Sequence, residues 1–413
     1  MGTPTTTILA LLLAFQASDR PVVRHPTEHY DLRIQGTEAE AERLGKLLEL
    51  AWPKFAETFR VEPPRKSGER LVIRLFDTAE ACLGGAMDDH ADMPPIKHPS
   101  WFSPGNGTVY LYRQRSDWFT RYLLIYGACL QFHGLAKPKN IDLDAWYTHG
   151  LAESLAVHAF DGDRLELGTS PAIAWMDHPA RAMAELGGKH LGLDPFTDRR
   201  IEDPSVRWAV VRFVSTGAEG RYRERFEKLA LGFSGSKVSG QDLVRSLGGE
   251  KKIGAEFSVW LLANQMPFAV VWPDWEVLPD GRFLGSPATE QLALCVAKEE
   301  FDTVEAVVVA AKDGIAGVPA IVMSLQDEND YVQARIVPPI VFVEHVRSGR
   351  LYGIETLSLG TPSPNLRVRV RTKDFRAELE IDSKTFPPIE VPRGRVGLAA
   401  IGGPVAFDGV KWR

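Results

Sequence analysis

The hydrophobic pattern of the first hundred residues switches between the period of a strand and the period of a helix. Apolar side chains recur at every second position in three runs, Tyr30–Ile34, Leu71–Phe76 and Thr108–Arg113. Between the first two runs, residues 38–59 carry apolar side chains at helical spacing, and Gly36-Thr37 supplies a turn and a cap before them. A second helix is predicted to begin at Asp77, because Glu80 follows this cap three residues later. Elements in this order predict a small α/β or α+β sheet.

The pattern becomes mostly helical from Trp118 to about Phe233. Helices are predicted over residues 119–132 and 143–160, and at least one more within residues 206–231. Residues 241–262 add short helices that end in an aromatic cluster. The sequence therefore predicts an N-terminal sheet followed by a helical lobe.

Beyond about residue 268 the pattern changes to short strands at close spacing. Nine runs alternate at period two between Gly, Pro, Asp and Asn turns: residues 291–296, 304–310, 320–324, 331–336, 340–346, 366–371, 376–381, 395–399 and 405–407. This pattern is typical of an antiparallel sandwich. We predict a multidomain protein, with an α+β domain over residues 19–268 and an all-β sandwich over residues 269–413. The sequence shows neither an internal repeat nor a low-complexity linker, so the two domains are expected to abut.

The N-terminus begins with a short apolar run, Ile8–Phe15. Such a run is too short to span a bilayer and suits the apolar region of a secretory signal peptide. The usual preceding positive charge is missing, and bulky Phe15 stands three positions before a cut after Ala17. We expect residues 1–18 to be a signal peptide and the protein to be secreted or periplasmic; the alternative is a cytoplasmic protein with an apolar N-terminus. No transmembrane segment is predicted.

Composition narrows the class of protein. The chain has 413 residues, 44% hydrophobic and 25% charged, which excludes a disordered chain. Its three cysteines, Cys82, Cys129 and Cys295, have no metal-like or redox-like spacing. The formal net charge of -6 gives no general basic field, so nucleic acid is not expected as a partner.

Two of the predicted helices carry an arrangement that resembles the gluzincin metallopeptidases, in particular a group of predicted secreted bacterial peptidases of unknown function. Residues 122–132 lie on the first helix, and Trp146-Tyr-Thr-His149-Gly-Leu-Ala-Glu153 opens the second. The resemblance covers roughly residues 28–265 and implies a zincin-like fold. In that family the first helix carries H-E-x-x-H, and the second opens with W-x-x-E-G-x-A-E, whose first Glu is the third zinc ligand. The Glu after the first His activates the metal-bound water.

All four chemical positions of that motif are replaced in this chain. Tyr126 stands at the first His, Gly127 at the catalytic Glu, Leu130 at the second His and His149 at the third ligand. Leucine has no lone pair, and tyrosine rarely ligates zinc. We therefore expect no catalytic residue, no metal and no cofactor here, and we predict an inactive pseudopeptidase.

A rebuilt metal site is the alternative. His133 lies seven residues after Tyr126 on the same predicted helical face, and His149 and Glu153 are neighbours one turn apart on the second helix. These three side chains could meet one ion. Otherwise His133 and His149 are partly buried histidines that form hydrogen bonds near a vestigial cleft.

The C-terminal strands resemble the jelly-roll domains of the concanavalin A-like lectin and glucanase superfamily, over roughly residues 272–413. The resemblance implies a fold that often binds or cleaves carbohydrate, without deciding between these and a packing role. The side chains that could serve are the carboxylates Asp327, Glu328, Asp330, Glu378 and Glu380 and the aromatic residues Tyr331, Phe342, Tyr352 and Trp412. Glu378 and Glu380 are expected on the solvent side of an alternating strand, and Asp327, Glu328 and Asp330 in a turn.

Together these observations predict an exported, non-catalytic pseudopeptidase joined to a lectin-like or glucanase-like sandwich. Its ligand would be a peptide in the old cleft or a glycan on the sandwich. The rival hypothesis is an active hydrolase, either a metallopeptidase that uses His133, His149 and Glu153 or a carbohydrate-active sandwich. The sequence leaves the oligomeric state open.

Overall fold

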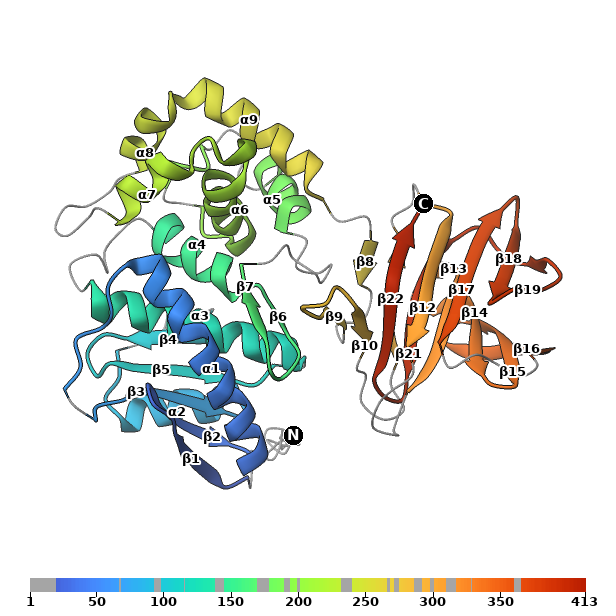
Figure 1. Cartoon of the computed structure of the whole chain (residues 1–413), viewed down its shortest axis with the longest axis horizontal. Helices are drawn as coiled ribbons and strands as arrows, with labels where there is room; N and C mark the ends of the chain where they lie inside the picture. Colours follow the sequence, from blue (N-terminus) through green and yellow to red (C-terminus); the bar gives the residue numbers. More distant parts are fainter. Residues whose placement is uncertain are drawn as a thin grey trace, which may run out of the picture.

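Figure 1 shows the computed structural model, coloured along the chain. The structure describes residues 20–66, 68–92, 98–114, 116–137, 145–168, 178–188, 194–198, 201–231, 240–265, 268–270, 275–285, 292–297, 301–309, 317–327, 329–359 and 365–413. The predicted signal peptide, residues 1–18, lies outside these ranges. No helix of the described residues is long and apolar enough to cross a membrane.

A five-stranded sheet lies in the N-terminal part of the chain. Its strands are β1 (Val22–Pro26), β2 (Tyr30–Gln35), β3 (Leu71–Phe76), β4 (Ser100–Ser103) and β5 (Thr108–Tyr112). The order across the sheet is β1-β2-β3-β5-β4. The three strands predicted from alternation, β2, β3 and β5, are parallel neighbours, and the unpredicted β1 and β4 add antiparallel edges.

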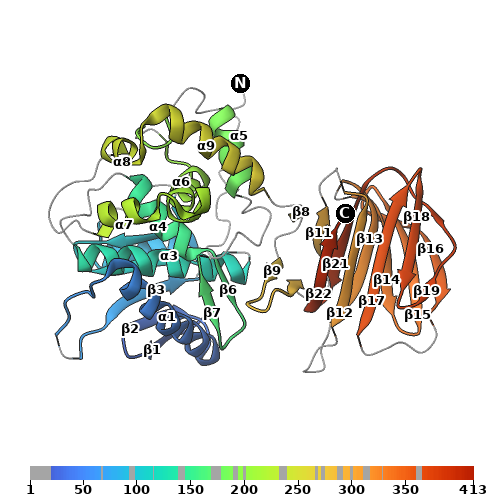
Figure 2. The ribbon, with the colours of Figure 1, turned by 45° about the horizontal axis from the view of Figure 1, so that its top comes forward.

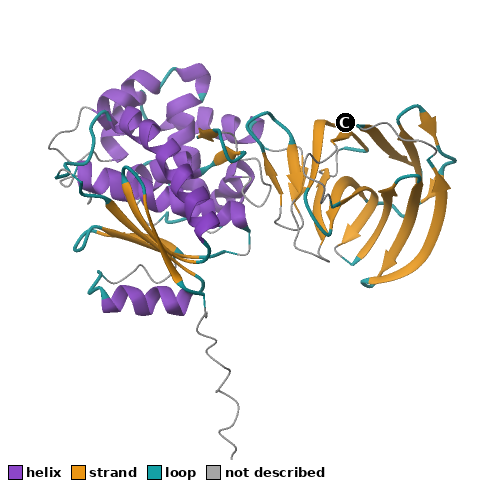
Figure 3. Ribbon diagram, turned by 60° about the horizontal axis from the view of Figure 1, so that its bottom comes forward, coloured by secondary structure: helices purple, strands orange, loops and turns teal. Residues whose placement is uncertain are grey.

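Helices cover both faces of this sheet. Helices α1 (Glu38–Phe59) and α3 (Asp117–Ala136) share a large core with residues such as Leu32 and Ile73 of the sheet. Helix α2 (Ala79–Asp88) covers the other face together with Trp101 and Tyr110, and Figure 3 shows one helix alone on that side. Thr37 caps α1 as predicted, since its side chain accepts a hydrogen bond from the Glu40 N–H.

The predicted start of α2 was wrong by one residue. Thr78, not Asp77, is the cap, and its side chain accepts a hydrogen bond from the Ala81 N–H. The Asp77 carboxylate instead accepts a hydrogen bond from Arg113 Nε, 2.6 Å away. Asp77, which the local pattern predicted as the helix cap, therefore binds a charged residue distant in sequence instead.

The helical lobe is built from helices α4 (Ala145–Ala156), α5 (His178–Gly187), α6 (Pro204–Thr216), α7 (Arg223–Leu231), α8 (Gly240–Leu247) and α9 (Glu250–Ala263). The helix predicted over residues 143–160 ends earlier, at Ala156. Residues 158–160 form strand β6 (His158–Phe160), which pairs with β7 (Leu165–Leu167). Asp161 explains the change, because its carboxylate accepts hydrogen bonds from the N–H groups of Asp163 and Arg164 and so closes a tight turn.

Two antiparallel sheets pack face to face in the C-terminal part. One has the order β19-β18-β17-β12-β22-β10-β9, with β20 paired to β18, and the other β16-β15-β14-β13-β21-β11-β8. Their bounds are β8 (Phe268–Val270), β9 (Trp275–Val277), β10 (Phe283–Gly285), β11 (Leu292–Ala297), β12 (Thr303–Val309), β13 (Val318–Asp327), β14 (Asp330–Val337), β15 (Ile340–Arg347), β16 (Arg350–Ser358), β17 (Leu366–Lys373), β18 (Arg376–Ile381), β19 (Lys384–Thr385), β20 (Ile389–Glu390), β21 (Arg395–Ile401) and β22 (Val405–Trp412).

The nine predicted runs correspond to β11 to β15, β17, β18, β21 and β22, whose alternate residues fill the core between the sheets. Strand β16 was missed. Its exposed face mixes charged residues with the exposed apolar side chains Leu351, Tyr352 and Ile354, so it lacks the alternation that marks a half-buried strand. β16 is an edge strand that pairs with β15 on one side.

One ion pair joins the helical part to the sandwich. Arg121 Nη2 of α3 lies 2.6 Å from Glu276 Oε2 of β9, and the two side chains are only 5% and 14% exposed. Figures 1 and 2 both show β9 on the side of the sandwich that faces α3, β6 and β7. Breaking such a buried pair by removing one partner leaves an uncompensated charge.

The turn between β17 and β18 holds a bulky side chain in a left-handed backbone conformation. Lys373 pairs with Arg376 across a two-residue loop, and both loop residues have positive φ, 50° at Asp374 and 63° at Phe375. Such loops favour Gly at the second position. The Phe375 side chain is 69% exposed, so no burial offsets its backbone strain.

We expect Phe375→Gly to raise the free energy of unfolding by about 0.5–1 kcal/mol. A left-handed L-residue costs roughly 1–2 kcal/mol, which exceeds the extra chain entropy that Gly loses on folding. The measurement is chemical denaturation, with Phe375→Ala as the control, because Ala removes the ring but keeps the Cβ. Equal stability of the Gly and Ala variants would show that the turn is not strained.

Candidate functional site

The structure brings together two of the replaced motif positions. Tyr126 of α3 and His149 of α4 are joined by a hydrogen bond between the Tyr126 hydroxyl and His149 Nδ1, 2.5 Å apart. The ring of His98 stacks on Tyr126, with centroids 4.5 Å apart. Burial lowers the pKa of His149 to about 3, helped by the nearby charge of Arg207, so the imidazole is neutral at physiological pH.

This hydrogen bond occupies the place where two zinc ligands would diverge. Zinc bonds of about 2.0–2.1 Å in a tetrahedral site separate two ligand atoms by roughly 3.3 Å. The Tyr126 and His149 atoms are 2.5 Å apart. In this arrangement the two side chains bind each other and leave no position for an ion between them.

Gly127, at the place of the catalytic Glu, marks a close approach of α3 to the sheet. A Cβ at this position would lie 2.6 Å from both Ser100 Oγ of β4 and Val109 Cγ1 of β5. Real Cβ atoms are almost never found so close to other heavy atoms, so no side chain fits without movement of the helix. Leu130, at the second His position, is partly buried and packs against the main core.

The structure does not bring His133, His149 and Glu153 together. Within the described residues, Glu28, His29 and Glu49 are the group of His, Cys, Asp or Glu whose ligand atoms all lie within 4.8 Å of one another. The ring of His133 instead lies 5.0 Å from Phe59 and 5.9 Å from Tyr147, centroid to centroid. His133 therefore packs among aromatic rings, and burial with the nearby Lys137 charge lowers its pKa to about 4.

Glu153 is a buried acid near the same helix pair. It is 2% exposed, and its Oε2 has no hydrogen-bond partner. Burial raises its pKa to about 8, against the opposing charge of Arg207. Glu153 is therefore largely protonated at neutral pH and can donate a proton or a hydrogen bond, but no nucleophile or metal ligand is placed against it within the described residues.

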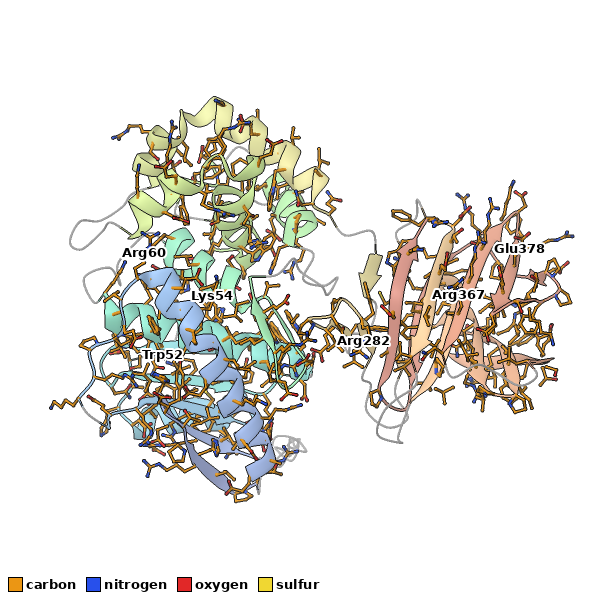
Figure 4. All side chains as sticks on the ribbon, in the orientation of Figure 1. Trp52, Lys54, Arg60, Arg282, Arg367 and Glu378 are labelled. Carbon is orange, nitrogen blue, oxygen red and sulfur yellow. The ribbon has the colours of Figure 1, made fainter. Side chains whose placement is uncertain are left out.

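The sandwich carboxylates lie where the sequence predicted. Glu378 and Glu380 are on the outer side of β18, between the buried residues Ala377, Leu379 and Ile381; Figure 4 labels Glu378 on this strand. Asp327 ends β13, and Asp330 begins β14. Each accepts a hydrogen bond from a backbone N–H of a turn, that of Asn329 and that of Ser348. Glu328 lies outside the described residues.

The aromatic candidates of the sandwich have different positions. Trp412 packs against the core between the sheets, which argues against its prediction as a sugar platform. Tyr331 and Phe342 are half-buried on β14 and β15, and Tyr352 on β16 is 79% exposed. The prediction omitted the exposed Phe375, because one aromatic residue between charges in a turn carries no periodic signal.

Polar and aromatic side chains contact one another on β14 and β15; we call this group the outer-face cluster. It consists of Gln333, Arg335, Phe342 and Glu344. Gln333 lies opposite Glu344, and Arg335 opposite Phe342, in the register of the two strands. The alternate residues Val332, Ala334 and Ile336 belong to the core, so the cluster faces away from the second sheet.

Contacts within the outer-face cluster fix the Arg335 guanidinium. Its Nε and Nη2 lie 2.8 Å and 2.7 Å from Glu344 Oε1, and its centre lies 4.7 Å from the Phe342 ring centroid. Gln333 Nε2 donates a hydrogen bond to the second oxygen of Glu344 at 2.9 Å. The Arg335 side chain remains 30% exposed, and its Nη1 has no partner among the described residues. Sequence alternation along β14 could have indicated this cluster, because Tyr331, Gln333 and Arg335 share one face.

Comparison with known proteins gives structural matches only. No family model matches the chain, and no curated protein does. A carbohydrate-binding module of Bacillus subtilis is 14% identical, with a TM-score of 0.29, over 36% of this chain and 95% of its own. The beta-glucanase of Bacillus licheniformis is 9% identical, with a TM-score of 0.27, over 35% of this chain and 85% of its own. Sheep galectin-11, solved with glycerol, is 11% identical, with a TM-score of 0.25, over 31% of this chain and 100% of its own.

These matches concern a part of the chain. Each match covers about a third of this chain, and each TM-score is below 0.5. The low identities and TM-scores transfer no ligand, substrate or residue role to this chain. The gluzincin resemblance of residues 28–265 receives no support from them and stays a prediction.

We expect Gly127→Ala to lower the free energy of unfolding by about 1–3 kcal/mol, because the added methyl overpacks the contact between α3 and the sheet. Gly84→Ala is the matched control: it lies within α2, and no atom lies within 4 Å of its would-be Cβ. The control should gain up to about 1 kcal/mol from helix propensity. Denaturant titrations measure both, and a stabilised Gly127→Ala would contradict the close approach.

Glu153 should make stability fall as pH rises. Its pKa in the folded protein is about 8, above the ordinary 4.5 of the unfolded chain. Between these pH values Glu153 is ionised in the unfolded state and protonated in the folded state. The free energy of unfolding therefore falls by about 1.4 kcal/mol per pH unit as pH rises. Glu153→Gln should remove that slope between about pH 5 and 8, whereas Glu38→Gln, at an exposed position of α1, should not. Unfolding free energies measured across this range test the difference.

Proposed function

We propose that this protein binds glycan through the outer-face cluster of its sandwich and that its helical part is non-catalytic. The observation that carries the proposal is the fixed, partly exposed Arg335 guanidinium, held by Glu344 and stacked on Phe342. A sugar presents hydroxyl groups, which donate and accept hydrogen bonds, beside an apolar face of C–H groups. The cluster offers donors on the partly exposed Arg335 and the edge of an aromatic ring, while the buried Glu344 and Gln333 hold the guanidinium in place.

The neighbouring strand extends this surface. Ile354 of β16 lies opposite Glu344 and is 52% exposed, and Thr356 lies opposite Phe342. An apolar side chain and a hydroxyl therefore flank the charged group toward the sheet edge. Because Glu344 already fixes Arg335, a ligand would meet a preorganised donor and would lose little side-chain entropy on binding.

The non-catalytic part of the proposal is supported by the helix pair. Tyr126 and His149 are hydrogen-bonded to each other, Gly127 leaves no space for a general base, and His133 lies among aromatic rings. These contacts favour a structural role for residues that align with the gluzincin motif. Export through residues 1–18 remains part of the same hypothesis.

Binding is tested with the full chain on a glycan array, followed by calorimetry with the strongest ligand. We expect Arg335→Gln to weaken binding at least tenfold, since a charged hydrogen bond contributes about 1.5–3 kcal/mol and about 1.4 kcal/mol is tenfold. Arg367→Gln is the control, on β17 of the other sheet (Figure 4), and should bind like the wild type. A second variant, Phe342→Leu, keeps an apolar side chain and removes the ring.

Three results would overturn the proposal in different ways. Failure of the wild type to bind any glycan would remove the function. Loss of binding in Phe375→Gly with full binding in Arg335→Gln would move the site to the β17–β18 turn. Peptide hydrolysis that a chelator abolishes, or release of reducing sugar from a bound glycan, would show an active hydrolase instead.

A further inference from the structure

A cavity of about 380 Å³ lies where helices α1, α4, α6 and α7 meet, away from the sandwich. Four cationic side chains line it: Lys54, Arg60, Arg212 and Arg223. Figure 4 labels Lys54 and Arg60 on α1, whose end approaches the helical lobe. Two carboxylates, Glu57 and Glu227, also line the cavity, so cations outnumber anions there although the chain has a net charge of -6.

Two of these cations have carboxylate partners and two do not. Lys54 Nζ lies 2.9 Å from Glu57 Oε2, and Arg60 Nη2 lies 3.3 Å from Glu227 Oε2. Arg212 and Arg223 form no ion pair within the described residues. Arg212 Nη1 donates to Gly168 O at 2.6 Å, with the guanidinium 5.9 Å from the Trp208 ring centroid, and Arg223 Nε donates to Ser215 O at 3.0 Å.

The two unpaired guanidinium groups influence each other. Both line the same cavity; burial lowers the pKa of Arg212, and the charge of Arg223 lowers it further. Each guanidinium has five N–H donors, and these contacts use one of them on each side chain. Like charges that face one cavity with unused donors are stabilised by an anion between them.

A hydroxyl group completes the lining. Ser154 of α4 is 7% exposed, lines the same cavity and forms no hydrogen bond within the described residues. Ser215 and Thr216 also line it, but their hydroxyls donate to the carbonyls of Val211 and Arg212 in their own helix. Ser154 therefore adds a free donor from a third helix.

We infer that this cavity is an oxyanion site, in which Arg212 and Arg223 bind the phosphate or carboxylate group of a small ligand and Ser154 donates a further hydrogen bond. Planar guanidinium groups match the oxygens of both anions. The inference is independent of glycan binding, because the cavity belongs to the helical part and shares no residue with the outer-face cluster.

Calorimetric titration of the full chain with inorganic phosphate, and separately with acetate, tests the site at constant ionic strength set by chloride. Saturable binding of one anion per chain is expected, weakened at least tenfold in Arg223→Gln. The matched control is Arg225→Gln, whose Nη1 donates to Ser246 O and which is absent from the cavity lining; its affinity should change less than twofold.

Arg212→Lys adds a second measurement, because it keeps the positive charge and removes the planar guanidinium group. It should weaken binding while the melting temperature stays near that of the wild type. Saturation by acetate alone would identify a carboxylate site, and saturation by phosphate would identify a phosphoryl site; either supports the inference. Absence of saturable binding for both anions, or equal losses in Arg223→Gln and Arg225→Gln, would overturn it.

Discussion

The close approach of α3 to the sheet is the constraint on which the helical part depends. Fifteen of its residues are buried, and Gly127 lets the helix lie directly against Ser100 and Val109. From this position α3 reaches α4 through Tyr126 and the sandwich through Arg121. A side chain at residue 127 would push α3 away from the sheet. The observed packing therefore leaves no space for a catalytic acid or base at this position.

The same constraint explains what became of the motif positions. Gly127 provides no general base. The hydrogen bond between Tyr126 and His149 stabilises the fold, because leaving these buried polar groups without partners would cost free energy. Glu153 and His133 each keep an unpaired polar atom in the interior. Both are neutral when buried, which limits the cost of their desolvation.

The organised polar groups lie elsewhere, on the outer face of β14 and β15 and in the cavity between the helices. In the first, a carboxylate compensates the arginine and fixes its direction. In the second, two arginines have no carboxylate partner in the described part of the chain and retain unused donors. The two arrangements differ in what they can bind: a compensated arginine suits neutral hydroxyl groups, whereas uncompensated arginines favour an anion.

The sequence by itself determined most of the elements and which side of them is buried, although it did not reveal β1, β4 and β16. The alternation of β17 and β18 and the helical spacing of α1 match the observed burial, because strand and helix periods are local properties. The tertiary structure decided which side chains meet. Arg335 and Glu344 are nine residues apart and meet through strand register, whereas Arg212 and Arg223 meet Ser154 through the packing of three helices. The alternative of a rebuilt metal site required His133 to approach His149, whereas in the structure its ring lies beside Phe59, since side-chain direction depends on how helices cross as well as on spacing.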